Sequence, residues 1–113
     1  NEFLLAIKRI NNIAPKDDIP RTINPELFES EAERELYEKV QSAGLQIRPL
    51  IDNSRYLDAI RILIPLKDAI NNFFDKVLVM DKREEIKQNR LSLIKALQIL
   101  AQQIADFSRL IER

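Results

Sequence analysis

Apolar residues recur along this chain at steps of three and four, the spacing of one face of an α-helix. The longest series starts at Ile86 and, with Arg90 as its one polar member, runs through steps of 4, 3, 4, 3, 4, 3 and 4 to Ile111. It predicts a final helix over about residues 83–111, long enough to cross the whole domain. The side chains expected to be buried in it are Leu93, Leu97, Leu100 and Ile104.

The first helix is predicted over residues 2–13. Its apolar face consists of Phe3, Ala6, Ile7, Ile10 and Ile13. Proline lacks a backbone donor and restricts the residue before it. Pro15, Pro20 and the pair Asp17-Asp18 therefore predict a connecting loop over residues 14–24.

Two signals mark alternative starts for the second helix. Asn24 with Pro25 fits an N-cap and first turn, whereas Ser30 with Glu33 fits a capping box. The sequence leaves this choice open. Gly44 is expected to end the helix in a left-handed C-terminal cap. The apolar stripe between these ends is Phe28, Ala32, Leu36 and Val40.

Residues 45–80 are predicted to hold two or three further helices. Pro49 and Pro65 are awkward inside one continuous helix, but each could start a new one. Ser54 is a plausible N-cap for a helix over residues 55–64.

The last part of this region carries an apolar stripe from Leu66 to Met80 in steps of four and three. The segment 77–79, Val-Leu-Val, has strand propensity, but we expect it to be helical because the stripe passes through it. The predicted fold class is therefore all-α. Residues 1–113 are expected to form a single bundle of five or six helices.

The amino-acid composition excludes several classes of function. The chain has 113 residues, of which 45% are apolar and 32% charged, as in a single soluble domain. Cysteine and histidine are absent, which excludes thiol nucleophiles, a histidine base and the usual zinc sites. A single glycine excludes a glycine-rich phosphate loop. We therefore predict no metal site, no cofactor and no catalytic activity in this chain.

The start of the sequence and the length of its apolar runs indicate what kind of protein the chain comes from. The sequence begins with Asn1 inside an apolar-periodic run, so we expect it to be a piece of a longer protein. No signal peptide is visible, and no apolar stretch is long enough to span a bilayer. The expected location is the cytoplasm, with neither a membrane nor DNA as a partner.

Charge is balanced overall but not locally. Lys and Arg total 18 and Asp and Glu total 18, yet residues 26–39 hold six glutamates against two basic residues, net −4, which leaves net +4 elsewhere. This pattern argues against a general polyanion binder but permits a local basic face. Such acidic arrays are usually solvated helix faces and only rarely cation sites. The array here is Glu31, Glu35 and Glu38.

Two polar features are candidates for function. Asn89 or Arg90 must face the core or its edge, because the apolar stripe of the last helix passes through this position. Arg90 could either bind loop carbonyls and a carboxylate such as Asp75 or Asp81, or reach a phosphate or base.

The second feature is a set of basic residues. They could merge into one RNA-sized patch if the first and last helices are neighbours, or they could be part of an ordinary surface of mixed charge. These residues are Lys8 and Arg9, beside Asn12, and Lys82, Arg83, Lys87, Arg90 and Lys95. Tyr37 and Tyr56 are the aromatic residues that could stack on bases.

At these motifs the chain resembles a known family. Residues 71–80, NNFFDKVLVM, and after a charged linker 89–94, NRLSLI, are similar to the C-terminal end of the β subunit of bacterial glycyl-tRNA synthetases, which reads roughly FFDxVxVM and then NRLxLL. Residues 8–13 resemble its KRVxNI, and residues 105–110 its closing segment. The resemblance covers nearly the whole chain in the same order.

The resemblance implies a helical anticodon-binding (DALR-like) domain that is not itself catalytic. Its implied partners are the anticodon region of glycine tRNA and the separate α subunit, which holds the aminoacylation site. The parent enzyme would be an ATP-dependent ligase that joins glycine to tRNA and uses Mg²⁺ together with ATP. The residues expected to contact RNA are Lys8, Arg9, Asn12, Arg83, Lys87, Asn89 and Arg90. The alternative is a helical docking domain that does not contact RNA, a role that the acidic segment 26–39 favours.

Overall fold

The computed structural model describes residues 2–16 and 21–111, with side chains described for 5–16 and 21–103. The elements are α1 (Glu2–Ile13), the 3₁₀-helix η1 (Pro25–Leu27), α2 (Glu31–Asp52), α3 (Tyr56–Leu63), α4 (Leu66–Lys76) and α5 (Glu84–Ile111). No strand occurs among these residues, so the predicted all-α class is confirmed.

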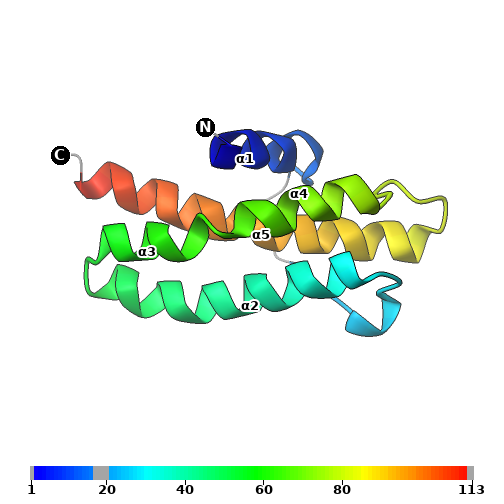
Figure 1. Ribbon diagram of the computed structural model, residues 1–113, viewed down its shortest axis with the longest axis horizontal. Helices are drawn as coiled ribbons and strands as arrows, with labels where there is room; N and C mark the ends of the chain where they lie inside the picture. The colour runs from blue at the N-terminus through cyan, green and yellow to red at the C-terminus, as the bar shows by residue number, and fades with distance from the viewer. Residues whose placement is uncertain (1, 17–20, 112–113) are drawn as a thin grey trace.

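The helices pack as an elongated bundle of 46 × 26 × 25 Å (Figure 1). α5 runs through most of its length and contacts α1, α2 and α3. α3 and α4 follow one another in a row that packs along α2, and α1 lies against α4 and α5 on the other side. Within the described part, no helix is both long and apolar enough to cross a membrane.

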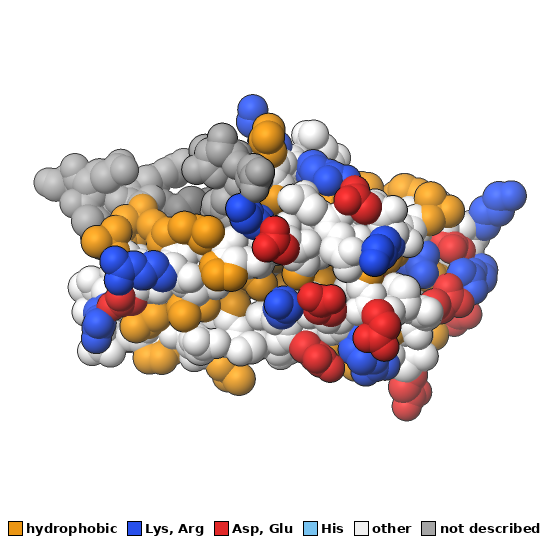
Figure 2. All heavy atoms as spheres, in the orientation of Figure 1, with side chains coloured by type: hydrophobic (Ala, Val, Ile, Leu, Met, Phe, Trp, Pro, Cys, Tyr) orange, Lys and Arg blue, Asp and Glu red, His pale blue; other side chains and the backbone are white. Residues whose placement is uncertain are grey.

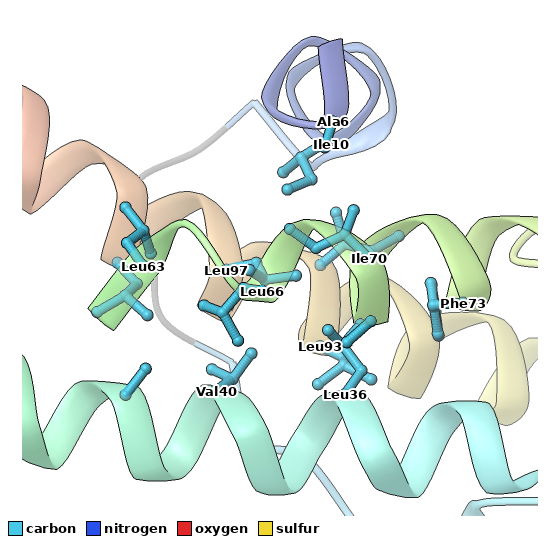
Figure 3. Packing of buried hydrophobic residues seen from close by; sticks show 14 of the residues in the cluster. Ala6, Ile10, Leu36, Val40, Leu63, Leu66, Ile70, Phe73, Leu93 and Leu97 are labelled. Atoms are coloured by element: carbon cyan, nitrogen blue, oxygen red, sulfur yellow. The ribbon is translucent and has the colours of Figure 1, made fainter. Parts of the chain in front are cut away.

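The core forms where the apolar stripes of these helices meet. Leu36 and Val40 of α2 point toward the row of α3 and α4 and toward α5 (Figure 3). Leu93, Leu97 and Leu100 are buried, as the stripe of the last helix predicted, whereas the side chain of Ile104 lies outside the described side chains. The bounds of α1 and α5 also match the predicted ones.

Both predicted starts of the second helix are used. The Asn24 side chain accepts a hydrogen bond from the backbone N–H of Glu26 and caps η1, and the Ser30 side chain accepts one from the N–H of Glu33 and caps α2. Of the two alternatives that the sequence left open, the start at Ser30 is therefore the correct one for α2, whereas Asn24 caps the separate 3₁₀-helix before it.

The predicted end of the second helix at Gly44 was wrong. α2 continues to Asp52, and Gly44 is an ordinary helical residue without positive φ. Its apolar stripe continues through Ala43 and Ile47, and burying these side chains outweighs the roughly 1 kcal/mol that a helical glycine costs. The prediction that Pro49 starts a new helix was also wrong, because Pro49 lies inside the last turns of α2. The helix tolerates it because Pro49 is exposed, so water can solvate the backbone carbonyl that its missing N–H leaves without a partner.

The predicted start of α4 was correct, whereas the predicted N-cap of α3 was wrong. Pro65 immediately precedes α4, as expected. Ser54 does not cap α3; it has a φ of 56°, and the N-cap position belongs to Arg55, which makes no side-chain capping bond. Of the predicted loop, residues 14–16 and 21–24 are non-helical, and Asp17, Asp18 and Pro20 lie outside the described residues.

Residues 77–79 are not helical, so their predicted helical conformation was wrong. α4 ends at Lys76, and Val77 is extended, with φ −118° and ψ 125°, before a turn at residues 79 and 80. Val77 and Val79 are buried, whereas the side chains of Leu78 and Met80 are exposed. This conformation buries both valines, and it also lets the carbonyl oxygen of Leu78 accept a hydrogen bond of 2.7 Å from Nη1 of Arg90.

Candidate nucleic-acid interface

Arg90, in the second turn of α5, lies at the centre of a cluster of charged residues. Its side chain is 7% exposed and faces Glu33 of α2, with distances of 3.2 Å from Nε to Oε2 and 3.3 Å from Nη2 to Oε1. Nη2 also contacts Glu29, Nη1 donates to the carbonyl of Leu78, and Asp81 lies 3.4 Å from Nη1. The guanidinium is therefore fully engaged within the protein. This arrangement corresponds to the structural role, in which Arg90 binds a loop carbonyl and carboxylates, and not to contact with a phosphate or base.

Glu33 is the partner that makes this burial possible. Its side chain is completely buried, and its Oε1 accepts hydrogen bonds from the backbone N–H of Glu29 and the hydroxyl of Ser30 as well as from Arg90. It thus serves both as the capping-box glutamate of α2 and as the counter-charge of Arg90. Among the described residues, no buried side-chain nitrogen or oxygen lacks a hydrogen-bond partner.

Arg83 closes the cluster at its solvent edge. It donates two hydrogen bonds to Asp81, at 2.9 and 3.0 Å, and two to Glu29, at 2.6 and 2.7 Å. These bonds hold the pKa of Asp81 well below its ordinary value and also lower the pKa of Glu29. The same carboxylates raise the pKa of Arg83. Half of the Arg83 side chain is still exposed, so it can reach a ligand only by competing with these two acids.

Asn89, the residue before Arg90 in α5, bonds a different segment, the chain at Asn24. Its Oδ1 accepts a hydrogen bond from the backbone N–H of Asn24 at 2.7 Å, and its Nδ2 donates to the carbonyl of Asn24 at 3.0 Å. This reciprocal pair fixes the chain just before η1 and leaves the buried amide with both of its ends satisfied.

Lys87 is a partly exposed basic residue of this region whose ion pair is made outside the charged cluster. Its ammonium lies 3.0 Å from Glu84, one turn earlier, and the bond lowers the pKa of Glu84. Exposed pairs of this kind contribute little to stability, so Lys87 can exchange its partner at small cost.

On α1, the predicted residues Lys8, Arg9 and Asn12 are all exposed. The Arg9 guanidinium lies over the ring of Phe74, 4.7 Å from its centroid, and contacts Asn71 at 3.2 Å and Asp75 at 3.7 Å. Its side chain is still 44% exposed. A planar guanidinium supported from below by an aromatic ring leaves its outer face open for stacking with a base.

The two predicted sets of basic residues are on neighbouring helices, but the member of the α5 set that lies at the end of α1 is Lys95, which is buried and bonded within the protein. α1 contacts α5 through Asn11, whose side-chain oxygen accepts from Gln98, and through the following Pro15, whose carbonyl accepts from Lys95. Gln98 lies 11 residues beyond Lys87, about 16 Å along the helix. Among the described residues, no hydrogen bond or ion pair links the α1 set to the start of α5.

The remaining candidates are explained by local structure. Lys95 is buried and bonds to Pro15 and Gln98, and Lys82 is exposed. Tyr37 packs edge-on against Phe28, with ring centroids 5.4 Å apart, and Tyr56 is half-buried against the core. The described residues contain no group of three or more acidic side chains suited to a metal ion, and Glu31, Glu35 and Glu38 lie on the exposed side of α2.

Sequence reasoning missed the role of Glu33, although a signal for it was present. Glu33 precedes Leu36 and Val40 by three and seven residues, so it occupies the inward stripe of α2 just as Arg90 occupies that of α5. Two inward charges of opposite sign at the ends of two stripes are expected to pair, because neither can be buried alone.

Comparison with known proteins agrees with the helical architecture. Residues 3–112 match the family model described as DALR anticodon binding domain. The chain is 43% identical over 109 residues to the glycine–tRNA ligase beta subunit of Thermodesulfovibrio yellowstonii, a match that covers 96% of this chain and 16% of that protein. The match to the same subunit of Hahella chejuensis has 39% identity and covers 93% of this chain and 16% of the relative.

A third relative, the glycine–tRNA ligase beta subunit of Rickettsia prowazekii, is 38% identical over 109 residues, which are 96% of this chain and 16% of that protein. The chain therefore spans about a sixth of the length of the relatives it matches. The resemblance expected from the motifs is confirmed.

Proposed function

The chain belongs to the DALR anticodon binding domain family, and we propose that it recognises the anticodon region of glycine tRNA as one domain of a longer glycine–tRNA ligase β subunit. The observation that carries this proposal is the family match over residues 3–112, joined to glycine–tRNA ligase relatives at 35–43% identity. In the longer protein, glycine would be joined to tRNA with ATP and Mg²⁺ at a site outside this domain, on a partner α subunit in the cytoplasm.

Within the domain, we propose that RNA contacts are divided by accessibility. Lys8 and Lys87 carry exposed or partly exposed ammonium groups suited to phosphates, which position the RNA. Arg9, supported by Phe74, is suited to stacking on or hydrogen bonding to an unpaired base, and Asn12 lies one helical turn further along α1.

The remaining three residues of the predicted set take different roles in this proposal. Arg83 would contribute at the edge of the charged cluster, where it is half exposed. Asn89 and Arg90 are both buried and hydrogen-bonded within the protein. Their role would be to hold the start of α5 and the chain before η1 in place, without touching RNA.

The balanced charge of the domain fits a role in specificity. A protein that binds RNA mainly through phosphate contacts needs a large excess of basic residues, and this chain has none. Other parts of the longer protein would supply most of the phosphate contacts, while this domain discriminates among anticodons.

The test is binding of the full-length protein to glycine tRNA with the intact anticodon and with altered anticodon bases, at two salt concentrations. We expect Arg9→Ala to weaken binding of the intact tRNA by about 1–3 kcal/mol and to affect an altered tRNA less. The matched control is Arg48→Ala, which removes an exposed arginine of α2. Equal affinity for all anticodons in the wild-type protein would overturn the proposal and favour a docking domain that does not read RNA.

A further inference from the structure

The outer face of α3 is apolar, although the helix already buries its opposite face. Its sequence, YLDAIRIL, contains only Asp58 and Arg61 as charged residues. Ala59 and Leu63 point into the core. On the other side, Leu57 is 65% exposed, and Ile64 follows it by seven residues and is 42% exposed. A helix that is apolar on both sides is typical of one that is covered on both sides.

The polar groups around this face are already paired with one another. Asp58 forms ion pairs with Arg55 and with Arg61, so the one acidic group at the margin of the face already has basic partners. The contact with Arg61 is long, at 3.6 Å, and the Arg61 side chain is 76% exposed. Its guanidinium is therefore able to accept a second carboxylate.

A hollow of about 230 Å³ lies beside this face, between α2 and the junction of α3 with α4. Its lining includes Ser42 and Gln46 from α2 and Ile62 and Pro65 from the junction. Figure 2 shows hydrophobic side chains gathered over α3 and the adjoining end of α2, whereas acidic and basic groups intermingle toward the other end of the molecule. The apolar face and the hollow together form a surface that could accept a side chain of a partner.

The exposed Leu45 of α2 shows what an isolated apolar residue looks like in the same molecule. It is 79% exposed, but the neighbours on its side of the helix, Gln41 and Arg48, are polar and exposed. Single apolar residues of this kind are common on protein surfaces. The outer face of α3 differs, because three apolar residues are grouped on it: Leu57, the half-buried Ile60 and Ile64. The frequency of single exposed apolar residues does not explain such a group.

We infer that the outer face of α3 docks against another part of the same, longer polypeptide, through an apolar surface that carries a carboxylate for Arg61. The matched region is 16% of the relatives' length, so 84% of such a protein lies outside it. Three side chains and one hollow fall well short of the roughly 800 Å² per partner that separate proteins need for a specific interface. A small contact suffices within one polypeptide, because the connecting chain keeps the local concentration high.

The test is the reactivity of single cysteines in the full-length protein. The described residues contain no cysteine, so Leu57→Cys and Ile64→Cys each introduce one reporter, and Leu45→Cys is the matched control. The rate of alkylation is measured for each peptide by mass spectrometry and divided by its rate in denaturant. We expect positions 57 and 64 to react at least about tenfold more slowly than position 45, the factor for an opening free energy of about 1.4 kcal/mol.

Each outcome of this experiment decides the matter. Slow reaction of the two α3 positions that persists on dilution and without tRNA supports docking within the polypeptide. Reaction as fast as at position 45 overturns it. Protection that disappears on dilution would assign the face to a second copy, and protection that needs tRNA would assign it to RNA, and both also overturn the inference. Two reporters, at opposite ends of α3, keep the test valid if one variant fails to fold. Because no arm depends on the anticodon, failure here leaves the proposed function untouched.

Discussion

Arg90 of α5 and Glu33 of α2 form a doubly hydrogen-bonded ion pair that is almost entirely removed from solvent, although 57 residues separate them in the chain. Each lies within the first two turns of its helix, on an otherwise apolar stripe. Each also bonds a nearby backbone group: Arg90 the carbonyl of Leu78, Glu33 the N–H of Glu29. The pair therefore joins two long helices to two non-helical segments at one end of the bundle.

Removing one member of this pair should destabilise the fold strongly. Arg90→Ala leaves the Glu33 carboxylate buried without its counter-charge, and we expect a loss of about 3–5 kcal/mol in the free energy of unfolding. Urea denaturation measures it. Replacing both residues by methionine should recover much of the loss. A variant that is as stable as the wild type but no longer binds tRNA would instead place Arg90 among the RNA contacts.

Leu97→Ala should also be costly, for a different reason. Leu97 is fully buried in the centre of α5, and truncating a buried leucine typically costs about 2–5 kcal/mol through lost burial and the cavity left behind. The matched control is Leu78→Ala, because Leu78 is largely exposed and its truncation should change stability by less than about 0.5 kcal/mol. Similar melting temperatures for the two variants would contradict the assigned core.

Gly44→Ala should stabilise the protein. Gly44 lies in the interior of α2 without positive φ, and a Cβ built there would meet no atom within 4 Å beyond its chain neighbours and the backbone of its own helix. Alanine is favoured over glycine in a helix interior by about 0.8–1.0 kcal/mol. A rise in melting temperature checks this prediction, and a fall would mean that α2 ends at Gly44 after all.

The charged cluster should make stability decline in acid. In the folded protein the pKa of Asp81 and that of Glu29 lie below their ordinary values of 3.8 and 4.5, mainly because of hydrogen bonds from Arg83. A carboxyl whose pKa is lowered by folding stabilises the protein fully above its unfolded-state pKa, and this contribution is lost as the pH falls through the folded-state pKa.

The contribution should therefore be constant near neutral pH and shrink below about pH 4.5. Asp81→Asn should lower stability at neutral pH and flatten its decline in acid, as urea denaturation at a series of pH values would measure. Parallel curves for the two proteins would show that Asp81 is not an acid-labile member of the cluster.

Phosphate contacts should be recognisable from their salt dependence. If Lys8 and Lys87 each contact a phosphate, alanine at either position should weaken binding to every tRNA alike. Each substitution should also reduce the slope of log affinity against log salt by about one unit. Filter binding over a range of salt concentrations measures the slope. An unchanged slope with Lys87→Ala would remove Lys87 from the phosphate contacts.

The parts of the fold that the sequence predicted are those that depend on periodicity alone. The stripe of α5 and the caps at Asn24 and Ser30 are local signals, and each led to the right element. The errors arose where packing against other elements overrode a local signal. Gly44 looks like a helix end, but Ala43 and Ile47 bury against the core and carry the helix past it.

The same competition explains the segment 77–79 and the charged residues of the site. The observed non-helical conformation of residues 77–79 buries both valines and also supplies the Leu78 carbonyl to Arg90, a contact across 12 residues that no periodicity reveals. For the same reason the sequence left Arg90 open between two roles and proposed Asp75 or Asp81 as its partner, when Glu33 is the principal one.

The central position of α5 has a consequence for how the molecule is made. Synthesis proceeds from α1 onward, so the ribosome releases the helices that pack on α5 before α5 itself emerges. Contacts among α2, α3 and α4 can form early because these elements are consecutive, but the apolar faces that await α5 stay open to water and to chaperones until then. Closing the bundle requires contacts between distant parts of the chain, such as the one between positions 33 and 90, and such long-range closure is the slow part of folding.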